Sequence, residues 1–407
     1  MNVLIVGSGG REHALAWSVS QSPSLATLHA APGNPGIASL GTCHPISATD
    51  PEALTALARD LSVDLVVIGP EAPLVAGVGD QLRAAGIAVF GPSAAAAKIE
   101  GSKVYAKDVM EAAGVATAEA LETAEAPCVL KADGLAAGKG VFVCPTPRDV
   151  EEALPRVEAL GNGIVIEELL VGQEASLFAI CDGMQALPLA PVQDYKRLRG
   201  GDEGPNTGGM GSFSPTPVVP SELVPEIIAT VHEPVLRELA SRGSPFVGLL
   251  YAGLMVTETG VRVLEFNCRF GDPETQALVP RLDGDLLTAL AAAASGDIQG
   301  IELGADPRKA ALTVVLASRG YPDTPETSVP IGGVEQAEAD GALVFHAGTA
   351  VREGQLVSAG GRVLGVTGVG TSVARARQVA YAAVNRIDFP GVQFRCDLAL
   401  TAPDTAA

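Results

Sequence analysis

Three polar side chains alternate with apolar ones in the stretch VLEFNCR. Residues two apart on a β-strand point to the same face, so Glu265, Asn267 and Arg269 would lie side by side. Leu264 and Phe266 would then enter the core. Carboxylate and amide oxygens suit Mg²⁺, which bridges ligand phosphates, and an arginine can fork onto a carboxylate or a phosphate. The pattern indicates a metal and phosphate site, with the polar outer face of a hairpin as the alternative.

A glycine-rich stretch with two lysines, KADGLAAGKG, begins at Lys131. It is not a P-loop, because Gly134 and Gly138 enclose three residues instead of four and a strand is expected to follow. The backbone of a glycine-rich hairpin tip can approach a triphosphate closely, while Lys131 and Lys139 supply point charges. We predict a loop that covers phosphates. A flexible tip with solvated lysines is the alternative.

The segment GSGGREH joins a short apolar strand to a helix that begins near Arg11. Free backbone N–H groups and the helix dipole at such a junction favour an anion. The dinucleotide fingerprint G-x-G-x-x-G is broken, because Glu12 stands where its third glycine belongs. A small phosphorylated ligand is therefore favoured over a dinucleotide, and a plain tight turn is the third alternative.

Two further segments carry weaker signals. In EELL, Glu167 and Leu169 share one side of a strand end whose free backbone groups could pair with an adenine edge. An exposed acidic pair would explain the same residues. The charged cluster QDYKR, which begins at Gln193, precedes the loop GPNTGGMG. Ordering so many glycines is costly in conformational entropy, which a functional loop would explain and a disordered loop would also explain.

The composition excludes several classes of protein. The 407 residues include 47 acidic and 27 basic side chains, a formal charge of −20. This balance disfavours nucleic acid and anionic membranes as partners, so a phosphorylated ligand must be held by local cations, backbone N–H groups or metal. No apolar run approaches the roughly 18 residues of a membrane helix, and no G-x-S-x-G or H-E-x-x-H motif occurs. The six scattered cysteines lead us to expect reduced thiols in a cytoplasmic protein.

Strand and helix signals alternate along the first hundred residues. Such alternation indicates a parallel sheet with helices on its faces, whose ligands bind beyond the carboxyl ends of the strands. The predicted strands are Asn2–Val6, Asp64–Ile68 and Ile87–Phe90, and helices are predicted from Arg11, near Gly77–Ala85 and at Ser93–Glu100. The loops that would meet at one mouth are Gly7–Arg11, Pro32–Asn34 and Gly69–Pro73.

From Ser102 onward the pattern becomes one helix followed by β-hairpins, which indicates an α+β unit. The last hundred residues carry three further strand signals and one amphipathic helix, Ser372–Arg386, and predict a small third domain. The hairpin strands are predicted at Val129–Lys131, Val141–Cys144, Ile164–Glu167, Ala175–Cys181, Leu249–Thr257 and Val261–Asn267, and the late strands at Ala311–Ala317, Ala342–Ala347 and Arg362–Thr367.

Taken together, these segments resemble the phosphoribosylamine–glycine ligase family. The matching stretches keep the family's order along the whole chain, which makes the resemblance highly specific. They are GSGGREHALAW (7–17), APGNPG (31–36), GPEAPL (69–74), EGSK (100–103), KADGLAAGKGV (131–141), QDYKR (193–197), GPNTGGMG (204–211), LLYAGLM (249–255), EFNCRFGDPETQ (265–276), FHAGT (345–349) and GGRVL (360–364).

The resemblance implies an ATP-grasp enzyme of mixed α/β and α+β class. It implies a parallel α/β substrate-binding domain at 1–101, an ATP-grasp domain at 102–303 with a lid lobe at about 115–180, and a β-rich domain with one helix at 304–407. The implied reaction joins glycine to 5-phospho-β-D-ribosylamine through a glycyl phosphate, with ATP as co-substrate and Mg²⁺ or Mn²⁺ as cofactor. This is the second step of de novo purine biosynthesis, in the cytoplasm, and we expect a monomer without nucleic-acid or membrane partners.

The resemblance also assigns roles to residues. It makes Arg269, Asp194 and Lys196 catalytic and Glu265 and Asn267 metal ligands. The implied ATP-binding residues are Lys103, Lys131, Gly138, Lys139, Glu167, Leu169 and Glu174. The implied substrate-binding residues are Gly9, Gly10, Arg11, Glu12, Asn34, Pro70, Glu71, Thr207, Gly208 and Gly209.

Two features depart from the family pattern. Position 195 is Tyr195 where the family is expected to have histidine, so no role for an imidazole is assigned here. The stretch Thr146–Gly163 is shorter than expected, which concerns the dimensions of the lid. An ATP-grasp ligase for a different carboxylate or amine, and an ATP-binding sensor that moves a lid without chemistry, are the rival interpretations. The broken fingerprint at Glu12 disfavours a nicotinamide dehydrogenase.

Overall fold

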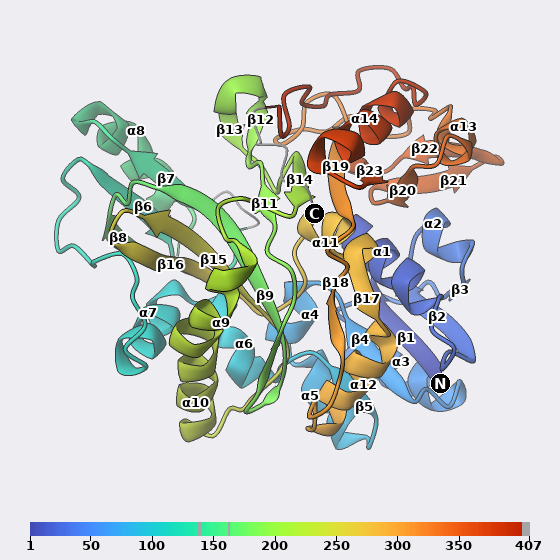
Figure 1. Cartoon of the computed structure of the whole chain (residues 1–407), viewed down its shortest axis with the longest axis horizontal. Helices are drawn as coiled ribbons and strands as arrows, with labels where there is room; N and C mark the ends of the chain where they lie inside the picture. The colour runs from blue at the N-terminus through green and yellow to red at the C-terminus, as the bar shows by residue number, and fades with distance from the viewer. Residues whose placement is uncertain (137–139, 162, 401–407) are drawn as a thin grey trace.

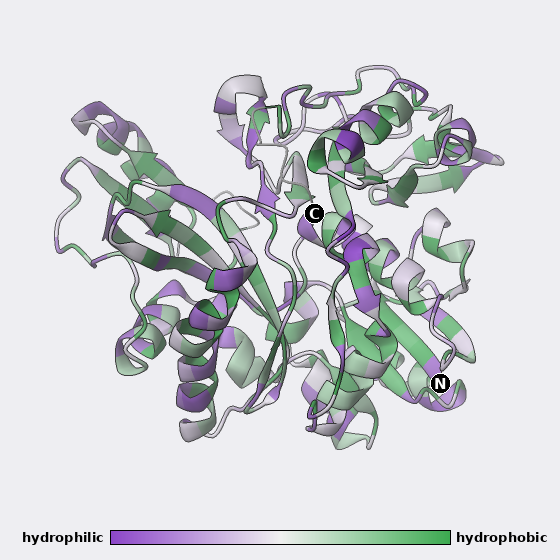
Figure 2. Ribbon diagram, viewed as in Figure 1, coloured by the Kyte–Doolittle hydropathy of each residue, from purple (hydrophilic) through white to green (hydrophobic). Residues whose placement is uncertain are grey.

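The computed structural model describes residues 1–136, 140–161 and 163–400. An N-terminal α/β unit, a two-lobed middle and a C-terminal β-rich unit follow one another along the chain (Figure 1). Hydrophobic residues follow the strands, whereas α10 (Glu233–Ser241) presents a hydrophilic side (Figure 2). No helix within the described ranges has both the length and the apolar character needed to span a bilayer.

The N-terminal unit is a five-stranded parallel sheet in the order β3-β2-β1-β4-β5. Leu4 and Val6 of β1 pack into one hydrophobic core, and Val3 and Ile5 pack into another. The three strands predicted in this unit are confirmed. Their sequences are continuous apolar runs because both faces of the sheet are covered. The strands are β1 (Asn2–Gly7), β2 (Thr27–Pro32), β3 (Thr42–Cys43), β4 (Leu65–Ile68) and β5 (Ala88–Phe90).

Six helices accompany this sheet. The short helix α4 begins inside the segment expected to be a loop, and Pro73 is tolerated there because a proline in the first turn gives up no helical hydrogen bond. The three helices predicted in this unit are confirmed, whereas the other three were not predicted. The six are α1 (Gly10–Val19), α2 (Pro35–Ala38), α3 (Pro51–Asp60), α4 (Glu71–Val75), α5 (Val78–Ala84) and α6 (Ala94–Gly101).

The small lobe is a three-stranded antiparallel sheet, β7-β6-β8, with its own hydrophobic core. It contains β6 (Cys128–Ala132), β7 (Val141–Cys144) and β8 (Ile164–Glu168), and it follows helix α7 (Lys103–Ala112). Sequence analysis missed α8 (Pro147–Glu158), although Thr146 and Asp149 form a capping box at its start. Pro155 inside this helix weakens the helical signal.

The large lobe is an antiparallel sheet in the order β10-β9-β15-β16. It shares both main cores with the N-terminal sheet, which fixes the two units against each other. Its strands are β9 (Gln173–Gly183), β10 (Ala186–Pro188), β15 (Phe246–Thr257) and β16 (Gly260–Asn267). The segments around it are α9 (Val224–Ile227), α10, α11 (Glu274–Leu278), α12 (Leu286–Ser295), and the short strands β17 (Leu282–Gly284) and β18 (Leu303–Ala305).

The C-terminal sheet has the order β11-β14-β19-β23-β20, and two of its strands come from the middle of the chain. Those two are β11 (Gln193–Asp194) and β14 (Gly211–Ser214), joined by a segment that contains the pair β12 (Arg197–Arg199) and β13 (Glu203–Asn206). The others are β19 (Ala310–Ala317), β20 (Leu343–His346) and β23 (Arg362–Gly370), accompanied by β21 (Thr349–Arg352), β22 (Gln355–Ser358), α13 (Val334–Ala339) and α14 (Val373–Val384).

Candidate active site

One cavity of about 960 Å³ collects side chains from the N-terminal unit, both lobes and the C-terminal sheet. Gly138 and Lys139 lie outside the described residues, but Ala136 and Gly140 beside them line the cavity together with Glu265. The residues predicted from the sequence that line it are Arg11, Glu71, Lys103, Lys131, Glu167, Leu169, Glu174, Asp194, Lys196, Thr207, Gly208, Glu265, Asn267 and Arg269. The predicted residues that do not line it are Gly9, Gly10, Glu12, Asn34, Pro70 and Gly209.

Two lysines meet one carboxylate at the small lobe. Lys131 Nζ lies 2.5 Å from Glu167 Oε2, and Lys107 Nζ lies 2.9 Å from Glu167 Oε1. The strand register explains the contact, because Val129 of β6 is opposite Glu167 of β8 and residue 131 is its next neighbour on the same face. The Lys131 ammonium also donates to the Leu264 carbonyl at 2.9 Å, which ties β6 to β16. Glu167 is thus ion-paired, not exposed as the alternative required.

Lys103 holds the base of the glycine-rich loop. It is the first residue of α7, and its backbone N–H donates to Asp133 Oδ1 at 2.6 Å. Its ammonium donates to the Gly134 carbonyl at 3.0 Å. Burial lowers the pKa of Lys103, and Lys131 acts in the same direction, while nearby carboxylates including Glu265 oppose them. Lys103 and Lys131 therefore influence each other electrostatically, and both line the cavity.

The strand β16 carries the predicted metal ligands. Glu265 is half-buried, and Asn267 is buried with its Oδ1 accepting from Arg269 Nη2 at 3.1 Å. The expectation that Leu264 enters the core is wrong. The pairing of β15 with β16 shifts between Gly253 and Leu254, so Leu264 is the extra residue of a β-bulge and stays half-buried at the cavity.

The oxygen atoms of Glu265 and Asn267 fit a hard cation that is also bound by water or by a ligand. Within the described residues no hydrogen bond or ion pair within 4 Å occupies the Glu265 carboxylate, and no group of three His, Cys, Asp or Glu suits a metal. A carboxylate and an amide oxygen on one strand leave most coordination positions to water and phosphate. Mg²⁺ is commonly bound in this way.

Arg269 is clamped by two acidic residues from the N-terminal unit. Its Nε lies 3.1 Å from Glu71 Oε2, and its Nη2 lies 3.1 Å from Glu100 Oε1. Burial favours the neutral acid, yet Arg269 and Arg11 hold the pKa of Glu71 below its usual value. Burial is also the main reason why the pKa of Glu100 is raised. The guanidinium is therefore fixed in orientation before any ligand arrives.

A buried acidic region lies in the same cavity wall. Tyr251 Oη donates to Glu274 Oε1 at 2.8 Å and accepts from Ser176 Oγ at 2.7 Å. The Asp194 side chain is 5% exposed and lies 3.7 Å from Lys196 Nζ. Burial raises the pKa of Asp194 to about 7, with Lys196 opposing the rise and nearby carboxylates, Glu274 first, adding to it.

Lys196 does not balance the charge of this region, because its ammonium also bonds Glu174. Asp194, Glu274 and Glu265 line the same cavity and influence one another electrostatically. The surplus of negative charge suits a cationic group of a ligand.

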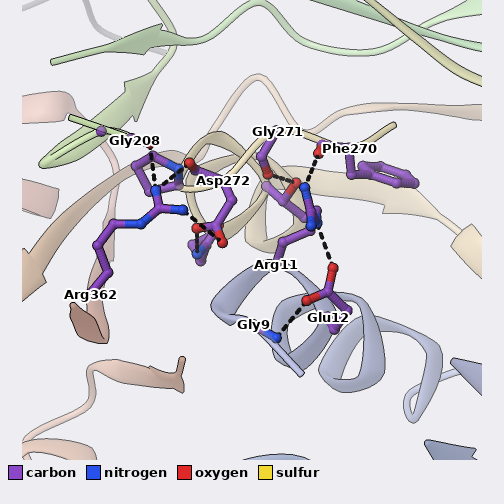
Figure 3. A network of polar contacts seen from close by, with 12 residues as sticks. Gly9, Arg11, Glu12, Gly208, Phe270, Gly271, Asp272 and Arg362 are labelled. Carbon is purple, nitrogen blue, oxygen red and sulfur yellow. Dashed lines mark hydrogen bonds and ion pairs between the residues drawn. The ribbon is translucent and has the colours of Figure 1, made fainter. Parts of the chain in front are cut away.

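The loop predicted at Thr207–Gly209 is held from both sides. Thr207 Oγ1 donates to the Lys196 carbonyl at 2.8 Å and accepts from the Gly209 N–H at 3.0 Å. Arg362 of β23 donates to the carbonyls of Gly208 and Asp272 and lies 3.3 Å from the Asp272 carboxylate (Figure 3). The C-terminal unit thus contributes an arginine to the cavity.

In the N-terminal loop, the free N–H group at the helix start is bound by a carboxylate of the same loop. Glu12 Oε2 accepts from the Gly9 N–H at 2.6 Å, so a carboxylate of the chain occupies the helix start where an anion was expected (Figure 3). Arg11 donates to the Phe270 carbonyl at 3.0 Å and pairs with Glu12. These two contacts hold the Arg11 guanidinium at the cavity wall. Asn34 caps α2 and donates to the His346 carbonyl at 2.8 Å. Of this loop, Arg11 lines the cavity.

Comparison with known proteins gives matches along most of the chain. Three family models match consecutive parts of the chain: the N domain of phosphoribosylglycinamide synthetase at residues 1–100, its ATP-grasp (A) domain at 101–275 and its C domain at 311–401. The chain belongs to the phosphoribosylglycinamide synthetase family. The resemblance and the ATP-grasp fold class expected from the sequence are thereby confirmed.

Full-length relatives support membership of the phosphoribosylglycinamide synthetase family. A phosphoribosylamine–glycine ligase of Streptomyces coelicolor is 51% identical over 417 residues, 99% of this chain and 99% of its own length. The protein of that name from Mesorhizobium japonicum is 49% identical over 415 residues, 98% of this chain and 97% of its own length. The crystal structure of a phosphoribosylamine–glycine ligase from Thermotoga maritima superposes with a TM-score of 0.84 at 36% identity, covering 98% of this chain and all of that one.

The fold extends beyond the phosphoribosylglycinamide synthetase family. The biotin carboxylase subunit of a pyruvate carboxylase superposes with a TM-score of 0.64 at 15% identity, over 97% of this chain and 92% of that one. At this identity the likeness concerns the fold.

Sequence reasoning missed several residues of the cavity. Sequence analysis assigned no role to four residues of quoted stretches, Glu100, Tyr251, Glu274 and Arg362, nor to Lys107 outside those stretches. Glu274 carries a readable signal, since it is an acidic residue inside FGDPETQ, shortly after the predicted metal strand. Arg362 could not be placed, because its position depends on a sheet assembled from distant segments.

Proposed function

We propose that the chain catalyses the ATP-dependent ligation of glycine to 5-phospho-β-D-ribosylamine, giving glycinamide ribonucleotide, ADP and phosphate. The observation that carries the proposal is one cavity that combines the buried Lys131 with half-buried lysines, the pair Glu265 and Asn267, the clamped Arg269 and a surplus of carboxylates. Close relatives bear the name of this activity. The same reaction belongs to the purine pathway, and a cytoplasmic location follows from it.

ATP would bind between the two lobes. Lys103 and Lys131 line the cavity and would supply positive charge to its phosphates, and the glycine-rich loop with Gly138 and Lys139 would cover them. Glu167, the Leu169 backbone and Glu174 would hold the nucleoside. The small lobe has a core of its own, so it can move as a unit and exclude water from the reaction.

Glu265 and Asn267 would hold Mg²⁺ or Mn²⁺ through their oxygen atoms. When bound, this ion neutralises charge that develops on the transferred phosphate. The Glu265 carboxylate interacts electrostatically with Lys103 and opposes the lowering of its pKa by burial. The metal and this lysine would therefore act on the same phosphates. One or two protein oxygens leave room for phosphate oxygens and water.

Glycine would bind as a zwitterion. Arg269 is fixed by Glu71 and Glu100 and can orient the carboxylate. Asp194 and Glu274 can accept hydrogen bonds from the ammonium. Holding the amino group in its charged form also keeps it from acting as a nucleophile. That leaves the amine of phosphoribosylamine as the attacking group.

The reaction then needs no covalent catalyst from the protein. A carboxylate oxygen of glycine bonds to the γ-phosphorus while the bond to the β–γ bridging oxygen breaks, releasing ADP. The amine of phosphoribosylamine attacks the acyl carbon, phosphate leaves with the bonding electrons, and the amine loses a proton. Positioning and fixed charge lower the barrier, which agrees with the lack of a nucleophile motif in the sequence.

The amine substrate would approach from the side of Arg11, Glu71 and the loop Thr207–Gly209. Gly9, Gly10, Glu12, Asn34 and Pro70 would act indirectly, by shaping the loops that place Arg11 and Glu71. All of these groups come from one chain, so the proposal needs a monomer only.

Omission of single substrates tests the proposal. ADP release is expected to require ATP, glycine and phosphoribosylamine together, and glycinamide ribonucleotide should form in equal amount. ADP release that requires neither glycine nor phosphoribosylamine would reject the proposal in favour of another ATP-grasp ligase. ATP binding without any glycine-dependent phosphate release would favour a sensor.

A further inference from the structure

The last described segment of the chain lies against one wall of the cavity. We call Arg395–Ala399 the C-terminal strap and Asp194–Asp202 the wall segment. Asp194 and Lys196 of the wall segment line the cavity and belong to the proposed substrate site. The strap is joined to the wall segment by several polar contacts, which neither the family match nor the proposed function explains.

Arg395, the first residue of the C-terminal strap, contacts the wall segment at several points. It is 2% exposed, and its Nη1 lies 2.7 Å from Asp202 Oδ1 and donates to the Arg197 carbonyl at 3.3 Å. Its guanidinium carbon lies 4.7 Å from the centre of the Tyr195 ring. A planar cation can stack on an aromatic face and fork onto oxygens at once, so one side chain holds three points of the wall segment.

Two further contacts strengthen this attachment. The Ala399 N–H donates to Tyr195 Oη at 2.8 Å, and the Gly201 N–H donates to Asp397 Oδ2 at 2.9 Å. Asp397 in turn holds the Arg395 guanidinium at 2.7 Å. The strap therefore has a cation, an anion and a backbone donor that each bind the wall segment.

The wall segment needs such support. Gly201 and Asp202 adopt φ values of 68° and 55°, in the left-handed region. A non-glycine residue is strained there and keeps this conformation where its surroundings enforce it. Arg395 binds the side chain of Asp202 at this turn. The wall segment would relax toward other conformations without the strap.

The strap is itself anchored to the C-terminal unit. Tyr381 Oη of α14 donates to the Arg395 carbonyl at 2.6 Å. Arg377, one turn earlier, donates to the carbonyls of Cys396 at 2.7 Å and Leu398 at 2.9 Å. Helix α14 packs on β19 and β23, so the attachment ends on a rigid sheet.

Tyr195 links the C-terminal strap to the residues that line the cavity. It stands between Asp194 and Lys196, and its ring packs 6.1 Å from that of Phe213 in the C-terminal core. A histidine at this position would have no atom where Tyr195 Oη meets the Ala399 N–H. We propose that Arg395 and Tyr195 are positioning residues, which fix Asp194 and Lys196 for glycine and phosphoribosylamine through the C-terminal strap. This inference rests on the proposed function for its substrates.

The test compares two conservative variants with matched controls. Tyr195→Phe removes one hydroxyl, and Arg395→Lys keeps the charge but loses the fork. Tyr105→Phe on α7 and Arg386→Lys, whose arginine pairs with Asp340 at the surface, are the controls. We expect kcat/KM for glycine and phosphoribosylamine to fall about tenfold in each test variant, mainly through KM, with KM for ATP unchanged. The controls should match the wild type.

Hydrogen exchange gives a readout that does not depend on activity. Amides from 195 to 207 should exchange faster in both test variants, while β6 and β8 keep their protection. Unchanged exchange in this segment overturns the proposal, and so does a fall in kcat with unchanged KM values, since that reports a loss of folded enzyme. If the wild type lacks glycine-dependent ADP release, the proposed function fails, and the exchange data still decide whether the strap fixes the wall segment.

Discussion

The ammonium of Lys131 and the carboxylate of Glu167 lie 2.5 Å apart, and both side chains are more than nine-tenths buried. Lys107 binds the other oxygen of the same carboxylate. A buried ion pair gains little over apolar packing, but the loss of one partner leaves a charge without compensation. At the proposed nucleotide site, this pair would make nucleotide binding and local stability depend on each other.

Glu167→Gln is expected to destabilise the free protein by about 3 kcal/mol, because Lys131 and Lys107 lose their shared anion. ADP should reduce the difference, since its phosphates bring negative charge to Lys131. Thermal unfolding with and without ADP measures both effects, and Glu168→Gln, at the neighbouring position of the same strand, is the control. An equal loss of stability in both conditions would show that ADP phosphate does not reach Lys131.

Glu265→Gln is expected to lower kcat by at least about a hundredfold, because a metal ligand at the phosphates would be lost. The fold should survive, since the side chain is half-buried and supports no core. ADP formation and Mn²⁺ binding in the presence of ADP measure the two effects. Glu258→Gln, at the exposed turn of the same hairpin, should retain both. An active Glu265→Gln enzyme with normal Mn²⁺ binding would contradict the metal assignment.

Glu274→Gln tests the binding of the glycine ammonium. The amide oxygen can still accept from Tyr251, so the change removes charge and keeps shape. We expect kcat/KM for glycine to fall about a hundredfold, while turnover of acetate, which lacks the amino group, changes little. The ratio of the two values measures recognition of the ammonium. A ratio equal to that of the wild type, or of the exposed control Glu335→Gln, would place the ammonium elsewhere.

Asp194 predicts the pH dependence. Burial raises its pKa to about 7, so the folded protein retains a proton that the unfolded chain releases near pH 4. Because the folded state binds more protons, the contribution of this group to stability is present below about pH 4 and is lost as the pH rises through 7. Asp194→Asn should remove this decline, of order 2–4 kcal/mol, in denaturant titrations at several pH values.

The activity should follow the opposite course. The ionised form of Asp194 is the one that accepts from an ammonium, so kcat/KM for glycine should rise as the pH approaches 7. In Asp194→Asn, kcat/KM for glycine should no longer rise with pH in this range. A wild-type profile that is flat between about pH 5 and pH 8 would exclude Asp194 from glycine binding.

The sequence predicted the strands that present the site because their signals are local. The turn after β1, the lysines around the glycine-rich hairpin and the alternation of Glu265, Asn267 and Arg269 could all be read within about ten residues. Alternation failed at Leu264, where a β-bulge adds one residue that no local pattern announces.

Contacts between distant segments could not be read in this way. Glu71 and Glu100 reach Arg269 across about 170 to 200 residues, and Arg362 reaches Gly208 across 154. The anion site expected at the helix start near Gly9 differs for a local reason. Its donor was identified correctly, but the chain's own Glu12 carboxylate accepts from it.

The pairing of β14 with β19 constrains how this chain is made. Gly211–Ser214 pairs with β11 on one side, but its partner on the other side is Ala310–Ala317, about a hundred residues further on. During synthesis on the ribosome, the wall that carries Asp194 and Lys196 must wait for that later strand to emerge. A gene cut between the second and third units would leave Phe213 and its neighbours at an unpaired edge, so neither piece alone is expected to carry a finished substrate site.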